Sequence, residues 1–172
     1  MLAALALASA CSGGSDKPRA LPSLSATATP SATPVVVPSA AKAHTPFGAA
    51  AFVRFYYAQL NLALQQANQG PLVGLSDASC GTCQRYVKSV ADLQRRNQRL
   101  QGDAIHVISA EAPPEQNGFV AVDVFMDAPT RAFVDASGRV VKRLPAEAAA
   151  HKTVYVKRVP LGWTVRAVQD AK

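Results

Sequence analysis

Two cysteines three residues apart form the part of this sequence where chemistry is first expected. Cys80 and Cys83 stand where a loop is predicted to become an amphipathic helix. The start of a helix lowers the pKa of a thiol, because the helix dipole and the free N–H groups stabilise the thiolate. Thioredoxin-like enzymes carry this spacing after a strand, usually with an aromatic residue before the first cysteine. Here Ser79 precedes Cys80, and no strand is evident upstream.

We therefore favour a structural disulfide between Cys80 and Cys83 that fixes the loop to the start of the helix. Closing so short a loop stabilises a fold by about 2 kcal/mol on the chain-entropy argument. A redox-active pair is the alternative. Metal binding would need two further ligands nearby, and His44, His106 and His151 are scattered along the sequence. We predict neither a metal site nor a cofactor.

A carboxylate in the most apolar predicted strand is the second candidate for chemistry. Asp123 shares a strand face with Phe119, Ala121 and Phe125, and burial there would raise its pKa toward that of a general acid or base. The interpretation we favour is that this face is solvated, and the same holds for His106. The sequence has no Gly-x-Ser-x-Gly motif and no phosphate-binding loop, so no catalytic residue is predicted.

The third cysteine, Cys11, follows a run of apolar and small residues at 2–10. This run is too short to span a bilayer and is typical of a secretory signal peptide. Since no basic residue precedes Cys11, we expect residues 1–10 to be a signal truncated at its N-terminus. Small residues before the cysteine resemble a bacterial lipobox, although Ala8 stands where leucine is usual. Ordinary cleavage, which would leave Cys11 a free thiol, is the alternative.

Lipid on Cys11 would hold the protein on the extracytoplasmic face of the cell membrane, because two acyl chains anchor stably where one is marginal. Cys80 and Cys83 would then remain as a pair in an oxidising compartment. Residues 11–45 are rich in Ser, Thr, Pro and Ala and lack aromatic side chains. Such a composition cannot offset chain entropy by burial, so we predict a disordered tether before a domain at 46–170.

The elements that must position these residues change character along the domain. Thr45 and Pro46 are typical of a helix start, and apolar residues recur at helical spacing as far as Gly70, which is expected to supply the left-handed residue that ends the helix. A second helix is predicted to be capped by Ser79 and to end at residues 101–102. Alternation then predicts strands at 104–110, 119–127, 131–135, 139–144, 152–159 and 163–168. This order predicts an α+β fold, with N-terminal helices packed on a curved antiparallel sheet.

The chain of 172 residues carries a formal net charge of +7, which suits an anionic partner. Export excludes nucleic acid, so we expect an anionic cell-wall polymer or a protein partner besides the membrane lipid. The basic residues expected on the strand surfaces are Lys142, Arg143, Lys157, Arg158 and Arg166.

Residues 46–170 resemble a family of uncharacterised actinobacterial lipoproteins, domain of unknown function 6318. The resemblance lies in the aromatic-rich stretch AAAFVRFY at 49–56 and the loop LSDASCGTC at 75–83. Helices followed by strands that end in GWTV at 162–165 also resemble the nuclear transport factor 2-like superfamily, a cystatin-like cone. The resemblance implies a fold and an address in the cell envelope but no reaction. We expect a non-enzymatic binding or accessory domain; the alternatives are a thiol-disulfide oxidoreductase using Cys80 and Cys83, or an enzyme or carrier with a cone pocket near Asp123.

Overall fold

The computed structural model describes residues 35–160 and 162–171. The predicted signal peptide, Cys11 and most of the predicted tether lie outside the described residues. Within the described part, no helix is both long and apolar enough to cross a membrane.

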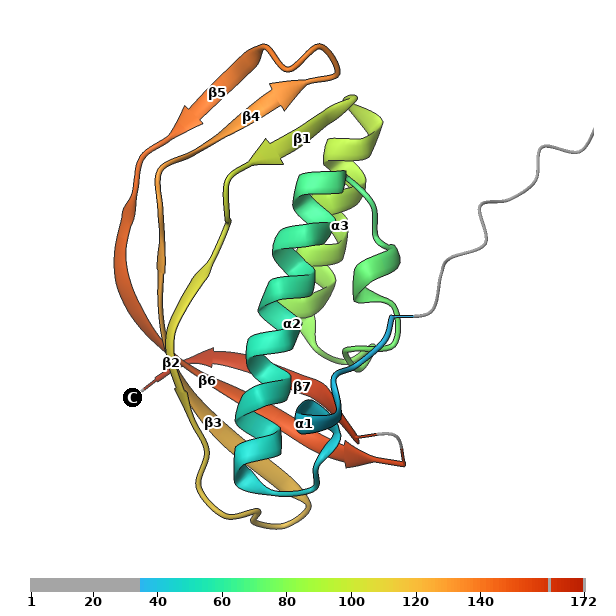
Figure 1. Cartoon of the computed structure of the whole chain (residues 1–172), viewed down its shortest axis with the longest axis vertical. Coiled ribbons are helices and arrows are strands. Elements are labelled where there is room, and N and C mark those ends of the chain that lie inside the picture. The colour runs from blue at the N-terminus through green and yellow to red at the C-terminus, as the bar shows by residue number, and fades with distance from the viewer. Residues whose placement is uncertain (1–34, 161, 172) are drawn as a thin grey trace, which may run out of the picture. The chain divides into compact units, whose positions relative to one another are not determined.

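Three α-helices and a 3-10 turn come first in the described chain (Figure 1). They are α1 (Ser39–Lys42), α2 (Pro46–Gln66), η1 (Gly70–Leu72) and α3 (Gly81–Arg95). Helix α2 begins as predicted, because Thr45 Oγ1 accepts a hydrogen bond from Gly48 N at 3.1 Å while Pro46 occupies the first helical position. Helix α2 therefore starts at a fixed residue, which sets the faces of all its later side chains.

Seven strands follow and form two antiparallel sheets. The strands are β1 (Gln98–Gln101), β2 (His106–Glu111), β3 (Phe119–Ala128), β4 (Arg131–Asp135), β5 (Val140–Leu144), β6 (Glu147–Val159) and β7 (Gly162–Asp170). The smaller sheet has the order β1-β4-β5, and the larger has the order β2-β3-β6-β7. The predicted α+β class is confirmed, but two sheets replace the single sheet expected. Pro129, which has no N–H to donate, separates β3 from β4 where the two sheets part.

The core lies between the helices and one face of the larger sheet. The predicted alternation in β3 is confirmed, since Val120, Val122, Val124 and Met126 are all buried. Helix α2 covers this face of the sheet in Figure 1. The largest fully buried side chains are Tyr56, Tyr57, Phe52, Leu60, Val53, Val90, Val120, Val122, Val124, Val134, Val154 and Val156.

Three predicted helix ends differ from the structure. The left-handed residue after α2 is Ala67, with φ 48°, rather than Gly70, which opens the 3-10 turn. Helix α3 is capped by Cys80, whose Sγ accepts from Cys83 N, rather than by Ser79. It ends at Arg95, not at residues 101–102, because Asn97 takes φ 51° and the chain turns into β1.

The start of the domain lies earlier than residue 46, so the predicted tether at 11–45 is wrong over its last eleven residues. Ala41 in α1 is buried, and Val35 and Val37 pack against the core. The indole of Trp163 donates from Nε1 to Ala43 O at 2.9 Å. Residues 35–45 have few large apolar side chains of their own, and a contact with a tryptophan far along the chain helps to hold them on the domain.

Candidate functional site

An open hollow of about 350 Å³ lies against α2, α3 and the concave face of the larger sheet. Its apolar wall is formed by Leu60, Leu64, Ala104, Ile105, Met126, Ala128, Ala148 and Ala150. Its polar wall is formed by Tyr86, Asp127, Arg131, Glu147 and Lys152. A mostly apolar concavity with a few converging polar groups is the usual form of a small-molecule site.

The hollow exists because the first half of β6 carries small side chains on its inner face. Val156 and Val154 continue the core along β6, and the same face then presents Lys152 and Ala150. The sequence analysis placed the start of this strand at 152, whereas β6 begins at Glu147. Alanine side chains are too short to fill the space that valine fills further along the strand, so a volume between the sheet and the helices stays empty here.

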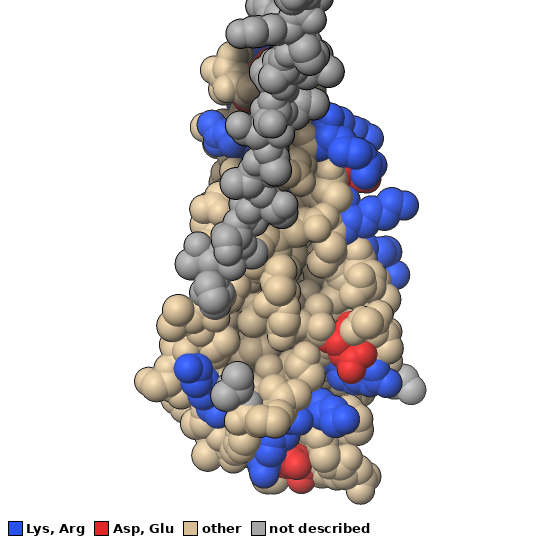
Figure 2. All heavy atoms as spheres, turned by 90° about the vertical axis from the view of Figure 1, so that its right-hand side faces the viewer, with Lys and Arg blue, Asp and Glu red and all other residues tan. Residues whose placement is uncertain are grey.

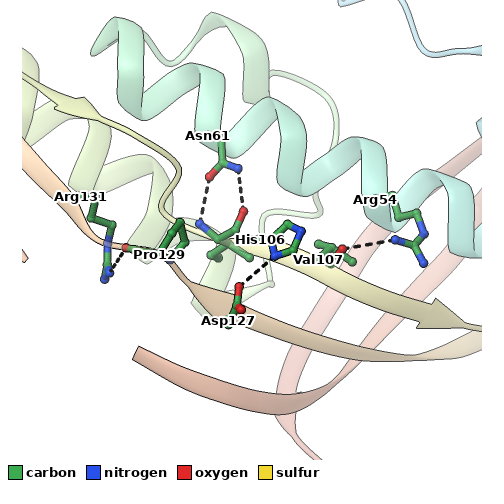
Figure 3. A network of polar contacts seen from close by, with 8 residues as sticks. Arg54, Asn61, His106, Val107, Asp127, Pro129 and Arg131 are labelled. Atoms are coloured by element: carbon green, nitrogen blue, oxygen red, sulfur yellow. Dashed lines mark hydrogen bonds and ion pairs between the residues drawn. The ribbon is translucent and has the colours of Figure 1, made fainter. Parts of the chain in front are cut away.

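A network of hydrogen bonds holds the residues just before β2, and the start of β2 itself, against α2 (Figure 3). Asn61 on α2 accepts from Ala104 N and Ile105 N at 3.0 and 3.1 Å and donates to Ile105 O at 2.7 Å. Arg54, two turns earlier on α2, donates to Val107 O at 3.4 Å. One amide side chain thereby satisfies three backbone groups, which sets the rim of the hollow at Ile105.

Three of the four charged side chains in the wall of the hollow pair with a group of opposite charge, and the fourth, Asp127, contacts an imidazole. Arg131 Nη2 lies 2.5 Å from Glu147 Oε1. The Lys152 ammonium donates to the Asp170 carboxylate. Asp127 Oδ1 lies 3.0 Å from His106 Nδ1, as Figure 3 shows. Each charged group of the wall therefore has a polar partner in the structure.

Tyr86 contributes a neutral phenol to the wall. Burial raises its pKa above the ordinary value of 10.0, and the nearby Arg85 offsets part of that rise. Burial also raises the pKa of Tyr56 and Tyr57 on α2. The Tyr57 hydroxyl is buried without a hydrogen-bond partner among the described residues. These phenols stay protonated at neutral pH, so none of them serves as a base.

The predicted disulfide between Cys80 and Cys83 is present. The two residues are 1% and 0% exposed, so a partner thiolate cannot reach either sulfur without local opening. The loop before them is fixed by Asp77, whose carboxylate accepts from Ser79 N and from Arg166 Nη1 at 2.8 and 2.9 Å. Burial and this loop favour the structural interpretation over the redox one.

Asp123 lies on the outer face of the larger sheet and is solvated, as the favoured interpretation predicted, so the alternative of a buried acid or base at Asp123 is wrong. Its side chain is 54% exposed and lies 3.6 Å from His151 Nε2. Phe125, its neighbour on this face, stacks on His151 with ring centroids 4.2 Å apart. His106 is also an exposed strand residue, paired with Asp127. The hollow lies on the opposite face of the sheet from Asp123.

The basic residues expected on the strands do not form one surface. Lys142 and Arg143 lie on β5 in the smaller sheet, while Arg158 and Arg166 on the larger sheet pair with Glu115 and Asp77. Lysine and arginine outnumber acidic side chains on the face shown in Figure 2, in separate groups. Among the described residues no cluster of three metal-ligating side chains occurs.

The sequence analysis named none of the polar residues of the hollow, and Lys152 is the one among them that it could have found. A signal was available, because residues 150, 152, 154 and 156 alternate onto one face of β6 and only position 152 is charged. A cation on an otherwise apolar strand face indicates either a strand end or a polar site. The strand continues on both sides of Lys152, so the second interpretation holds.

Comparison with solved structures finds similar chains at low sequence identity. The intermembrane space region of the chloroplast protein ARC6 is similar at 10% identity, with a TM-score of 0.52 over 73% of this chain and 97% of that one. Aln2 from a Streptomyces species is similar at 16% identity, with a TM-score of 0.39 over 69% of this chain and 87% of that one. No curated protein matches the chain. Residues 25–169 match the family described as "Family of unknown function (DUF6318)", and the chain belongs to this family.

Proposed function

We propose that this chain is a non-enzymatic binding domain that holds a small, mainly apolar molecule in the hollow beneath α2. The observation that carries the proposal is an open concavity with an apolar wall, in which both cations are paired with carboxylates. Catalysis of acid–base type needs a group poised to exchange a proton with its substrate. Binding needs only shape, apolar surface and a few polar contacts.

The proposal extends to the place of the domain in the cell. A diacylated Cys11 would hold the domain at the extracytoplasmic face of the cell membrane, and the segment before residue 35 would serve as the tether. The helices against a concave antiparallel sheet support a nuclear transport factor 2-like cone. Many folds of this shape use the concave side for ligands, which agrees with the position of the hollow.

The binding proposal is tested with the uncharged dye N-phenyl-1-naphthylamine, whose fluorescence rises in apolar surroundings. We expect saturable binding to the full chain. Ala150→Phe fills the hollow from β6 and should weaken binding by about tenfold or more, which corresponds to about 1.4 kcal/mol. Ala149→Phe is the matched control, because Ala149 is exposed and does not line the hollow. Equal affinity of both variants and the wild type would contradict the proposal.

The anchor is tested separately by mass spectrometry of protein extracted from membranes. We expect a diacylglyceryl group on Cys11, and we expect Cys11→Ala to move the protein into the soluble fraction. An unmodified Cys11 in the mature protein would mean that the domain is secreted rather than anchored. That result would contradict the proposed anchor but not the proposed binding function.

A further inference from the structure

The two cations in the wall of the hollow are more buried than the acids that pair with them. The Arg131 side chain is 11% exposed and its partner Glu147 is 66% exposed. The Lys152 side chain is 31% exposed and its partner Asp170 is 87% exposed. In both pairs the positive group is the more buried one; Glu147 also lines the hollow, whereas Asp170 lies outside it.

Lys152 is held on the concave face by the register of the sheet. It lies between Val124 on β3 and Asp170 on β7, and both Val124 and the next inner residue of β6, Val154, are fully buried. The aliphatic stem of Lys152 therefore lies along apolar surface, and its ammonium meets the Asp170 carboxylate on β7. Asp170 stands near the end of the described chain, where its side chain can turn toward water.

Arg131 is held more firmly than Lys152. Its Nη1 donates to Pro129 O and to Pro145 O, each at 3.2 Å, and only Nη2 is used for Glu147. The guanidinium would thus keep its place if Glu147 moved away. Asp127, the remaining acid of the wall, is engaged by His106 on the rim.

Electrostatics favours exchange of these surface acids for an anion inside the hollow. An ion pair with a solvent-exposed partner contributes only about 0–1 kcal/mol, so releasing Glu147 or Asp170 to water costs little. A bound carboxylate or phosphate would receive charge-assisted hydrogen bonds from cations that are already largely desolvated. Its apolar part would cover the alanine and leucine side chains of the wall.

We propose that the molecule held in the hollow is an anionic amphiphile, with one apolar chain and a carboxylate or phosphate head. The head lies at Lys152 and Arg131, and Asp170 and Glu147 turn outward as displaced counterions. This proposal rests on the proposed binding function and specifies the class of its ligand. Asp170 and Glu147 would then weaken ligand binding, because their carboxylates compete with the head of the ligand for Lys152 and Arg131.

The test compares three probes of equal chain length by calorimetry at neutral pH, below their critical micelle concentrations: decanoate, decanol and decyltrimethylammonium. We expect decanoate to bind the full chain about tenfold more tightly than decanol, and the cationic probe to bind most weakly. In the Lys152→Gln variant, decanoate should bind no more tightly than decanol. In the Lys152→Arg variant, which keeps the positive charge, decanoate should again bind more tightly than decanol. The affinity for decanol should be the same in both variants.

Removal of a competing acid gives the sharper result, because affinity should rise. Asp170→Asn is expected to tighten decanoate binding about threefold or more, with decanol unchanged. Asp92→Asn is the matched control, since Asp92 pairs with Arg95 away from the hollow. Asp170 is exposed, so this variant keeps the fold and carries the test if Lys152→Gln does not fold.

The outcomes separate this inference from the function beneath it. Equal affinities for decanoate and decanol, or tighter binding of the cationic probe, would overturn the anionic class while the hollow remained a binding site. Weaker decanoate binding by Asp170→Asn would also overturn it. Absence of binding by all three probes and by the uncharged dye would overturn both proposals.

Discussion

Arg131 and Glu147 join the two sheets where the chain crosses between them. The guanidinium belongs to β4 in the smaller sheet and the carboxylate to β6 in the larger one, with Nη2 and Oε1 2.5 Å apart. The same guanidinium donates to Pro129 O, in the crossing from β3 to β4, and to Pro145 O, in the crossing from β5 to β6. One side chain therefore holds both connections between the sheets.

Arg131→Met is expected to lower the free energy of unfolding by about 1–2 kcal/mol, because two hydrogen bonds to carbonyl groups and the ion pair to Glu147 are lost together. Glu147→Gln should lower it by less than about 1 kcal/mol, because its partner contact is exposed on one side. Urea unfolding of the two variants and the wild type measures the difference. Equal losses in the two variants would mean that the ion pair, not the carbonyl contacts, carries the stabilisation.

The buried disulfide gives a second prediction. Replacing Cys80 and Cys83 together by alanine should lower the free energy of unfolding by about 2 kcal/mol, because a short closed loop is released in the unfolded chain. The wild-type sulfurs, whose residues are 1% and 0% exposed, should resist alkylation in mild reductant until urea unfolds the domain. Rapid alkylation of the folded protein would instead favour the thiol-exchange alternative.

Strong periodicity made the larger sheet and helix α2 predictable. The valines of β3 alternate with other residues along the strand, and Thr45 with Pro46 leaves little choice of helix start. The spacing of apolar residues gave a wrong prediction where the same spacing is compatible with both a helix and a strand. Leu100 continues the helical spacing of α3, yet Asn97 adopts a left-handed conformation and places Leu100 in β1, where it is buried.

Long-range contacts set the remaining parts, and no local pattern reports them. Residues 35–45 have the composition of a linker, but Trp163 bonds to Ala43 across 120 positions. The hollow could not be predicted, because it depends on the absence of large side chains in the first half of β6. The alanines there carry no strong strand signal, and they leave an empty volume only because α2 lies opposite them in the fold. Asp123 was named because it breaks an apolar strand, and Lys152, which does the same on the inner face, was assigned to a strand end.

The hairpin between β4 and β5 gives a prediction about pH. Hydrogen bonds from the Ser137 hydroxyl and from Arg139 lower the pKa of Asp135 from 3.8 to about 2. The folded chain binds this proton less tightly than the unfolded chain does, so the stabilisation is fully present above about pH 4 and is lost as the pH falls toward 2.

Asp135→Asn should therefore be less stable than the wild type at about pH 6, and the difference should shrink between about pH 4 and pH 2. Urea unfolding at intervals of pH measures both profiles, and Asp103→Asn, an exposed aspartate outside this turn, is the control. Parallel profiles for Asp135→Asn and the wild type across that window would contradict the assignment.

Gly48 tests whether residues 35–45 belong to the folded domain. Alanine in a helix is favoured over glycine by about 1 kcal/mol, so propensity alone predicts that Gly48→Ala stabilises α2. A Cβ at this position would lie 1.9 Å from Ala43 O, the same oxygen that accepts from Trp163. Overpacking of this kind costs about 1–3 kcal/mol, and moving Ala43 also breaks the indole contact.

We therefore expect Gly48→Ala to lower the free energy of unfolding by about 2 kcal/mol in urea titrations, with a change in the fluorescence of Trp163 in the folded protein. Gly81→Ala is the matched control, because a Cβ there meets no atom within 4 Å at the start of α3, and it should raise stability by about 0.5 kcal/mol. If both variants were stabilised alike, Ala43 would not be packed on α2, and the domain would begin at residue 46 as the composition alone suggests.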